Sequence, residues 1–150
     1  MPHSYISIYV HCVFGAKRRA RMITPELEKR LHPYLGGIAR ENDMKALAIG
    51  GIEDHVHVLL SLTRTLSVAK AVQLLKGASS KWVHDTFPEH RHFEWQGGYG
   101  AFSVSTSRVE ATVAYIHRQK EHHHRRTFQE EYVALLKKHG VEYDEREVWD

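Results

Sequence analysis

The segment HVHVLLSL, residues 55–62, alternates so regularly that it fixes the side to which each of its side chains points. Successive side chains of a β-strand face opposite sides of the sheet. One face of this strand therefore carries Val56, Val58, Leu60 and Leu62. His55 and His57 lie next to each other on the opposite face, where both imidazoles could reach one divalent ion. The alternative is a pair of surface histidines on a half-exposed strand, and the spacing alone leaves both interpretations open.

Three other segments have strand character. In SYISIYVHCVF, residues 4–14, one face carries Ile6, Ile8, Val10, Cys12 and Phe14, and the other carries Tyr5, Ser7, Tyr9 and His11. The segment YGAFSVSTS, residues 99–107, repeats the pattern more weakly, and ALAIGGI, residues 46–52, is a short strand. Together they predict a sheet with one apolar face that helices must cover and a second face of hydroxyls, aromatics and histidines.

Four helices are expected between and after these strands. Thr24 is a candidate N-cap with Pro25 at the first helical position, and Ser67 is a candidate N-cap for the second helix. Apolar stripes follow the two caps, made of Leu27, Leu31, Tyr34, Leu35 and Ile38 in the first helix and of Val68, Ala71, Val72, Leu75 and Trp82 in the second. The sequences SRVE (107–110) and TFQE (127–130) have the capping-box pattern, and Gly140 predicts the end of the last helix.

The order of these elements is β-α-β-β-α-β followed by two helices, which is the plan of a ferredoxin-like, or RRM-like, α+β fold. We expect a two-layer sandwich in which an open antiparallel sheet has helices on one face, with extra helices at the C-terminal end. With 150 residues and no repeat or linker, the chain is expected to form a single domain over residues 1–150.

Composition narrows the class of protein. Hydrophobic residues make up 42% and charged residues 26%, as in ordinary soluble domains, and no apolar run approaches the ~18 residues of a membrane span. The apolar N-terminal stretch has its charges behind it, whereas a signal peptide has them in front. Cys12 is the only cysteine, so it forms no disulfide within the chain and is expected to be an inert core thiol. We therefore predict a cytoplasmic protein without a membrane partner.

The net charge of +3 is unevenly distributed. The last ten residues, VEYDEREVWD, carry a net charge of −4, so the first 140 residues carry +7. Much of this excess lies in KRRAR (17–21) and HRQKEHHHRR (117–126). A basic body with 13 histidines favours a polyanionic partner. A solvated charged surface has the same composition, so the charge alone leaves both possibilities.

A tyrosine and a glutamine stand four residues apart in VAYIHRQKEHHH, residues 113–124. On a helix, Tyr115 and Gln119 would lie on one face, beside a docking stripe of Val109, Val113 and Ile116. Such a pair more often consists of packing or solvent-facing side chains than of catalytic ones. A catalytic role for the pair becomes better supported because the same small basic chain also contains the His-x-His strand.

In these segments the chain resembles the HUH single-tyrosine transposases of the smallest bacterial insertion sequences, including domesticated relatives that act on repeated palindromes. The resemblance covers nearly the whole chain. It is carried by GIEDHVHVLLSL (51–62), LSVAKAVQLLKGASSKW (66–82), WQGGYGAFSVSTS (95–107), VAYIHRQKEHH (113–123) and TFQEEYVALLKKHGVEYDEREVW (127–149).

The resemblance implies a role for each candidate site residue. It implies that His55, His57 and Gln119 bind Mg²⁺ or Mn²⁺ and that Tyr115 is the nucleophile. The implied substrate is single-stranded DNA folded into a hairpin beside the cleavage point, and the implied intermediate is a 5′-phosphotyrosine. The resemblance also implies a homodimer in which the helix bearing the tyrosine is donated to the partner's histidines.

A basic groove is the expected recognition mode for single-stranded DNA. Candidate contacts are Arg18, Arg19, Arg21, Lys76 and Lys81, each of which could instead be a solvated surface charge. His11 is expected on the site-facing side of the first strand, either as a structural residue or as a partner of the site. The run from His122 to His124 is interpreted as basic surface, because three consecutive helical residues point in different directions.

Other tyrosines, namely Tyr99, Tyr132 and Tyr143, lack a glutamine four residues later, so Tyr115 is the preferred nucleophile.

Two other functions remain open. A domesticated nuclease that processes host palindromes would have the same sequence features as a transposase. A non-catalytic RNA- or DNA-binding module would use the same sheet and stack bases on Tyr5 and Tyr9.

Overall fold

The computed structural model describes residues 3–123 and 125–149. Its strands and helices in chain order are β1 (Tyr9–Gly15), α1 (Pro25–Glu41), β2 (Lys45–Ile52), β3 (His55–Ser61), α2 (Val68–Thr86), β4 (Gly100–Val104), α3 (Val109–His117), α4 (Gln119–His122) and α5 (Phe128–Lys138). Short 3-10 turns occur at η1 (Lys17–Arg19), η2 (Pro88–His90) and η3 (Thr106–Arg108). The predicted order β-α-β-β-α-β followed by helices is confirmed. In the described part of the chain, no helix is long and apolar enough to cross a membrane.

The four strands form one sheet in the order β2-β3-β1-β4, and every neighbouring pair is antiparallel. This is the strand order of the ferredoxin-like fold, which is therefore confirmed. The histidine strand β3 lies inside the sheet, between β2 and β1. Gly50 and Val13 are the neighbours of His57 on the two flanking strands.

Helices α1 and α2 cover one face of the sheet, as expected. The Thr24 hydroxyl accepts a hydrogen bond from the Leu27 amide at the start of α1, and the Ser67 hydroxyl accepts one from the Lys70 amide at the start of α2. The apolar sides of both helices pack with β1 and β3 in one large cluster, whose fully buried members include Phe14, Leu31, Leu35, Val56, Val58, Leu60 and Leu75. This cluster is the main core.

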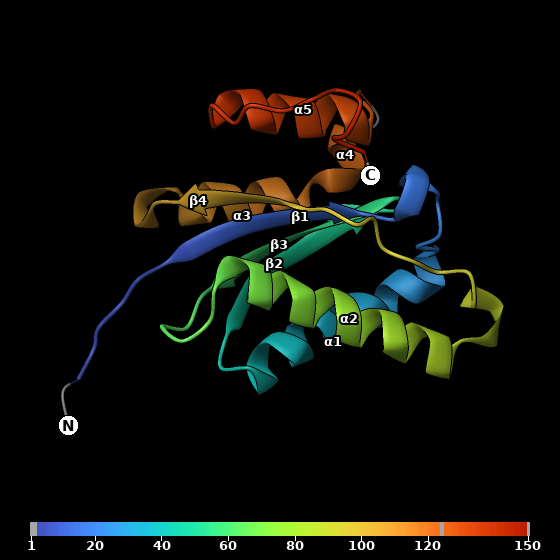
Figure 1. Cartoon of the computed structure of the whole chain (residues 1–150), viewed down its shortest axis with the longest axis horizontal. Helices are drawn as coiled ribbons and strands as arrows, with labels where there is room; N and C mark the ends of the chain where they lie inside the picture. Colours follow the sequence, from blue (N-terminus) through green and yellow to red (C-terminus); the bar gives the residue numbers. More distant parts are fainter. Residues whose placement is uncertain (1–2, 124, 150) are drawn as a thin grey trace.

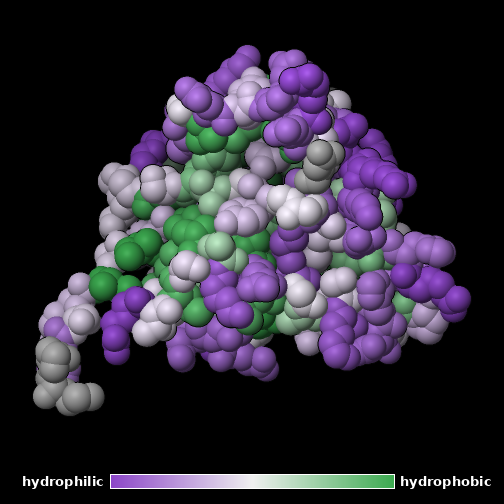
Figure 2. Space-filling model, viewed as in Figure 1, coloured by the Kyte–Doolittle hydropathy of each residue, from purple (hydrophilic) through white to green (hydrophobic). Residues whose placement is uncertain are grey.

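The opposite face of the sheet is not open, contrary to the prediction. Helix α3 packs against β2 and β3, and α5 lies above β1 and β4 at the C-terminal end of the chain (Figure 1). Beneath α5, the side chains of Val13, Phe102, Phe128, Tyr132, Leu135 and Leu136 form a second apolar cluster, and Ala48, Leu59 and Ile116 form a third beneath α3. The outer surface of α5, at the top of the view, is mostly hydrophilic (Figure 2). The C-terminal helices therefore add a third layer.

Three local predictions need correction. Strand β1 begins at Tyr9 rather than at residue 4, because the paired residues of β3 and β4 end opposite Tyr9, and beyond it the pairing continues only as the hydrogen bond from the Leu62 amide to the Ile8 carbonyl. The SRVE sequence makes no capping box, since Ser107 lies in a 3-10 turn with its hydroxyl 3.1 Å from that of Ser105. The single helix expected around Tyr115 is interrupted at Arg118. The TFQE capping box, in contrast, is confirmed at Thr127.

Helix α3 approaches the backbone of β2 at Gly50. A Cβ atom built at Gly50 would lie 2.2 Å from the carbonyl oxygen of Ile116. We therefore expect Gly50→Ala to displace the end of α3 and lower the free energy of unfolding by about 1–3 kcal/mol. Gly77→Ala is the matched control, because a Cβ there meets nothing within 4 Å and helical alanine is favoured over glycine by roughly 0.5–1 kcal/mol. Denaturant unfolding of both variants checks this, and equal stabilities would contradict it.

Candidate metal and nucleophile site

His55 and His57 are the centre of the site, and both side chains are fully buried. They project from β3 toward the C-terminal layer. The His55 ring stacks on the Phe128 ring at the start of α5, with centroids 4.1 Å apart and planes 7° apart. The interpretation of the two histidines as half-exposed surface residues is therefore wrong, because α5 covers them.

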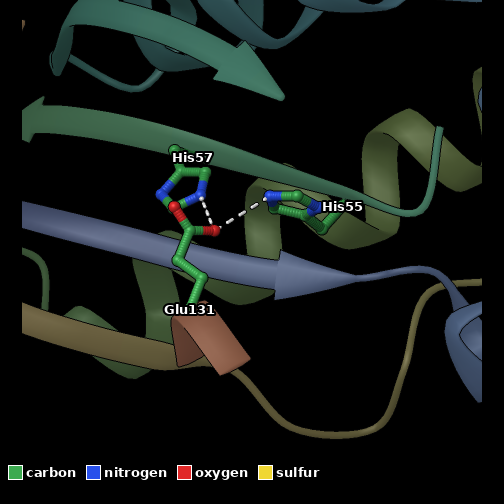
Figure 3. Close-up of side chains that lie close together, drawn as sticks. All are labelled: His55, His57 and Glu131. Carbon is green, nitrogen blue, oxygen red and sulfur yellow. Dashed lines mark hydrogen bonds and ion pairs between the residues drawn. The ribbon is translucent and has the colours of Figure 1, made fainter. Parts of the chain in front are cut away.

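A carboxylate that the sequence analysis missed lies between the two imidazoles. Glu131, in the first turns of α5, places its Oε1 atom 3.0 Å from His57 Nε2 and 3.3 Å from His55 Nε2 (Figure 3). These three side chains have ligand atoms close enough together to hold one metal ion. A signal was present in the sequence: Glu131 stands three residues after Phe128 and four before Leu135, so the apolar stripe of this helix contains one acid.

Gln119 and Tyr115 reach the same carboxylate from the other side. Gln119 Oε1 lies 3.0 Å from His55 Nε2, and Gln119 Nε2 donates a 2.9 Å hydrogen bond to Glu131 Oε2. The Tyr115 hydroxyl donates a short hydrogen bond to the same oxygen. The structure therefore brings together all four predicted residues, His55, His57, Tyr115 and Gln119, within one chain. The helix break at Arg118 separates the last two but leaves both directed at Glu131.

Each histidine of β3 has an outer partner on its second nitrogen. His55 Nδ1 lies 2.7 Å from Asp54 Oδ1, and His57 Nδ1 lies 2.7 Å from Nε2 of His11. Ligand histidines in metal sites are usually held this way through the nitrogen that does not face the ion. His11, which is buried on β1, is thus a partner of the site and orients His57.

The buried imidazoles differ in their tendency to hold a proton. Burial, reinforced by the proximity of His57, lowers the pKa of His11 to about 3. Burial also lowers the pKa of His57 despite the adjacent Glu131 carboxylate. For His55, burial alone would lower the pKa, but hydrogen bonds to Asp54 and Glu131 outweigh it and raise the pKa to about 9. At neutral pH without a metal, His55 is the cationic partner of Glu131 and the other two rings are neutral.

The same contacts shift the pKa values of the acidic groups of the site. Burial alone would raise the pKa of Glu131, but hydrogen bonds from the surrounding histidines hold it well below its usual range. Burial and the negative charge of Glu131 both raise the pKa of the Tyr115 phenol. Tyr115 is therefore protonated at neutral pH, with its hydroxyl held by the carboxylate.

The donor set fits a divalent cation. Asp54 offers only acceptor oxygens, so His55 donates its Nδ1 proton to it, and Nε2, which is protonated in the metal-free protein, offers a lone pair once that proton is lost. That lone pair faces two further acceptors, Gln119 Oε1 and Glu131 Oε1. Three acceptors directed at one another need either a proton or a cation between them. A set of imidazole, amide and carboxylate ligands suits Mn²⁺ or Mg²⁺.

The three predicted DNA-binding arginines lie in or just after the turn η1, and two of them line a groove at one rim of this site. Arg18 and Arg19 are in the turn η1, and the Arg19 guanidinium lies over the Trp149 ring at 5.1 Å. Arg19 and Arg21 line a groove of about 470 Å³ together with Arg125 and Arg126. Their contact with DNA stays a prediction.

The two predicted lysines have protein partners. Lys76 donates hydrogen bonds of 2.6 and 3.1 Å to the carbonyls of Gln96 and Gly98, so it anchors the segment that leads into β4. Lys81 forms an exposed ion pair with Asp85 on α2, which covers the face of the sheet away from the histidines. A DNA role for either lysine also stays a prediction.

A separate cleft opens beside the tyrosine. It has a volume of about 600 Å³, and its lining includes Tyr115, His11 and the basic side chains of Arg108, Arg126 and Lys138. The Tyr115 phenol therefore stands between the buried histidine cluster on one side and a cationic cleft on the other.

Comparison with known proteins places this site in a family context. The profile of the family described as "Transposase IS200 like" matches residues 4–119. The curated ISDra2 transposase TnpA of Deinococcus radiodurans is 29% identical over 116 residues, which cover 74% of this chain and 83% of the relative.

Two solved structures share the fold. A crystal structure assigned to a transposase from Deinococcus radiodurans R1 matches with a TM-score of 0.63 and 24% identity, over 78% of this chain and 97% of that chain. A REP-associated tyrosine transposase bound to a REP hairpin matches with a TM-score of 0.59 and 16% identity, over 82% of this chain and 73% of the other. The profile match extends over more than half of the chain and includes His55, His57, Tyr115 and Gln119. The chain therefore belongs to the IS200-like transposase family, a family of enzymes that cleave DNA and transfer strands.

Proposed function

We propose that this protein cleaves and rejoins single-stranded DNA, with Tyr115 as the nucleophile and His55, His57 and Gln119 as metal ligands. One observation carries the proposal: β3, α3 and α4 direct these four side chains at the buried carboxylate of Glu131 on α5. Glu131 is a further candidate ligand through Oε1. A bound Mg²⁺ or Mn²⁺ would polarise the scissile phosphate and stabilise the charge that builds on it.

In the proposed reaction, Tyr115 Oη attacks phosphorus in the DNA backbone. The bond from Oη to phosphorus forms as the bond from phosphorus to the 3′ oxygen breaks, and the leaving oxygen takes up a proton in place of the one that the phenol loses. The products are a 5′-phosphotyrosine and a free 3′-hydroxyl. The covalent link retains the energy of the phosphodiester, so another 3′-hydroxyl can be joined without ATP.

The cationic cleft beside Tyr115 supports a single-stranded substrate. Arg108, Arg126 and Lys138 line it at a point where a phosphate could reach the phenol. A flexible single strand could lay its backbone into this cleft, whereas a duplex is much wider and stiffer. We propose a hairpin beside the cleavage point, as the structural neighbour with a bound REP hairpin suggests. A DNA substrate agrees with the cytoplasmic location expected from the sequence.

Among the alternatives, a domesticated palindrome-processing nuclease is favoured by the same neighbour. The genomic DNA beside the gene separates it from a mobile element, since matching subterminal hairpins mark an element. A non-catalytic module with bases stacked on the open sheet is disfavoured, because α3 and α5 cover the sheet face that it would need.

We also propose a homodimer in which α3 of one chain serves the histidines of the partner. A single chain also brings its own Tyr115 and Gln119 to its histidines, so lack of space is no reason for a trans arrangement. The trans arrangement is supported instead by the family resemblance and by the weak attachment of α3, of which only Ile116 is buried.

The decisive test is a covalent adduct on single-stranded flanking DNA in the presence of Mn²⁺. A 5′-phosphotyrosine stays on the downstream fragment, so a strand labelled at its 3′ end should yield a protein-linked band on a denaturing gel. The same strand labelled at its 5′ end should yield only a shorter free product. EDTA should abolish both products and excess Mn²⁺ should restore them. Undiminished cleavage in EDTA would show that the metal assignment is wrong.

A further inference from the structure

A third histidine reaches the site from the segment between α4 and α5. The sequence pattern predicts basic surface for His122 to His124, but the His123 side chain is buried against the site. His124 lies outside the described residues. The His123 ring contacts the His55 ring edge-on, with centroids 4.7 Å apart. His123 therefore belongs to the buried cluster and not to the surface.

The contacts of His123 show which of its nitrogens faces the site. His123 Nδ1 lies 2.8 Å from the main-chain carbonyl oxygen of Arg126. A carbonyl oxygen only accepts, so Nδ1 donates to it, and Nε2 faces two further acceptors, Gln119 Oε1 and Glu131 Oε1, with room between them for either a proton or a cation. This is the arrangement of His55, whose Nδ1 donates to Asp54. A carbonyl or carboxylate on the outer nitrogen is the usual support of a metal-bound imidazole.

His123 Nε2 points at the same place as His55 Nε2. His123 Nε2 lies 3.1 Å from Gln119 Oε1 and 3.1 Å from Glu131 Oε1. For His55 Nε2, the distances to the same two oxygens are 3.0 and 3.3 Å. Ligand atoms at ~2.1 Å from one ion lie about 3.0 Å apart in octahedral geometry and about 3.4 Å apart in tetrahedral geometry. Each of these pairs has a spacing that fits neighbouring ligands of one ion, whereas the ligand atoms that already lie within 4.8 Å of one another are those of His55, His57 and Glu131, so His123 would move toward this group when an ion binds.

From this geometry we propose that His123 is a metal ligand, the third imidazole of the site beside His55 and His57. The inference rests on the metal site of the proposed function and specifies its chemistry. Three imidazoles with Gln119 and Glu131 form a nitrogen-rich set, which favours Mn²⁺ and later first-row metals over Mg²⁺, whose preferred ligands are oxygens. The ion would also hold the connection between α4 and α5 against β3.

The test measures metal binding rather than cleavage. Mn²⁺ binding to the full-length protein is titrated by the electron paramagnetic resonance signal of free Mn²⁺, and pulsed spectra of the bound ion count the coordinated imidazole nitrogens. The parent should show three such nitrogens and His123→Ala two. The variant should bind Mn²⁺ at least tenfold more weakly, while its Mg²⁺ affinity changes less. His117→Ala, on the exposed side of α3, is the matched control and should keep the parent's affinity.

The outcomes are separable. A parent with two nitrogens, or a His123→Ala variant with unchanged Mn²⁺ affinity, overturns the role of His123 and leaves the proposed function intact. A parent that binds no Mn²⁺ overturns the metal site of the proposed function as well. The nitrogen count in the parent requires no substitution, so it decides the question even if His123→Ala does not fold.

Discussion

Replacing Tyr115 with phenylalanine should reduce the covalent DNA adduct to background, because the substitution removes the only oxygen that can attack phosphorus from this position. Removal of the nucleophile in other covalent enzymes costs roughly 10⁴-fold or more in rate. The fold should persist. Gln119 Nε2 still donates to Glu131 Oε2 after the phenol is gone, so we expect a loss of about 1 kcal/mol in the free energy of unfolding. Binding of hairpin DNA should also persist, because phosphate contacts dominate it.

The control for this variant is another tyrosine. Tyr99 is 37% exposed and its hydroxyl makes no contact with the buried cluster, so Tyr99→Phe should form the adduct at the parent's rate. Adduct yield on the 3′-labelled strand and DNA affinity are measured for both variants. An undiminished adduct in Tyr115→Phe would mean that a different side chain attacks.

Replacement of both His55 and His57 with alanine should also abolish cleavage, since it removes two of the proposed metal ligands. The cost to stability should be much larger than for Tyr115. The Glu131 carboxylate is fully buried, and loss of both imidazoles leaves it with fewer partners. Removing the partner of a buried charge costs about 3–5 kcal/mol. The measurements are adduct yield, Mn²⁺ binding and thermal unfolding.

A more conservative substitution distinguishes loss of metal binding from loss of the folded structure. His57→Gln keeps a side-chain N–H that can reach Glu131 but removes the imidazole. We expect it to fold, to bind Mn²⁺ more weakly and to cleave far more slowly than the parent. A His57→Gln protein that cleaves at the parent's rate would contradict the assignment of His57.

The two inactive proteins together test the proposed dimer. A heterodimer of Tyr115→Phe and His55→Ala/His57→Ala contains one intact site if the tyrosine helix serves the partner. Partial recovery of activity is therefore expected once subunits have exchanged. If each chain uses its own helix, as in the single chain described here, every site carries a lesion and the mixture stays inactive. A clean monomer in solution would remove the dimer altogether.

Much of the fold was predictable because its signals are local. Period-two alternation located β3 to within a residue, and the hydroxyl caps at Thr24, Ser67 and Thr127 marked three helix starts. The direction of His55 and His57 followed from the strand period alone. Tyr115 and Gln119 also lie on one side of their segment, as the spacing predicts, although the helix that carries them is interrupted at Arg118.

What could not be predicted depends on contacts between distant segments. Nothing local in β3 shows that α5, about 75 residues later, covers its histidines, so the sheet face was expected to be open. The carboxylate of Glu131 and the imidazole of His123 become ligand candidates only when α5 docks on that face. The wrong capping box at Ser107 has a similar origin, since a serine three residues before a glutamate forms that motif only if the helix starts there.

The two helical layers on either side of the sheet are unequal. Helices α1 and α2 share one large apolar core. Helices α3 to α5, in contrast, pack on two smaller apolar clusters and on a hydrogen-bonded network of polar side chains. Burial of one large aliphatic side chain such as Ile116 contributes only ~1.5–3 kcal/mol. Subglobal opening, in which one cooperative unit detaches while the remainder stays native, therefore has its lowest free energy in the C-terminal layer. Opening of this layer alone would give a bulky polymer such as DNA access to Tyr115, His55 and His57 while the sheet on which their geometry depends stays folded.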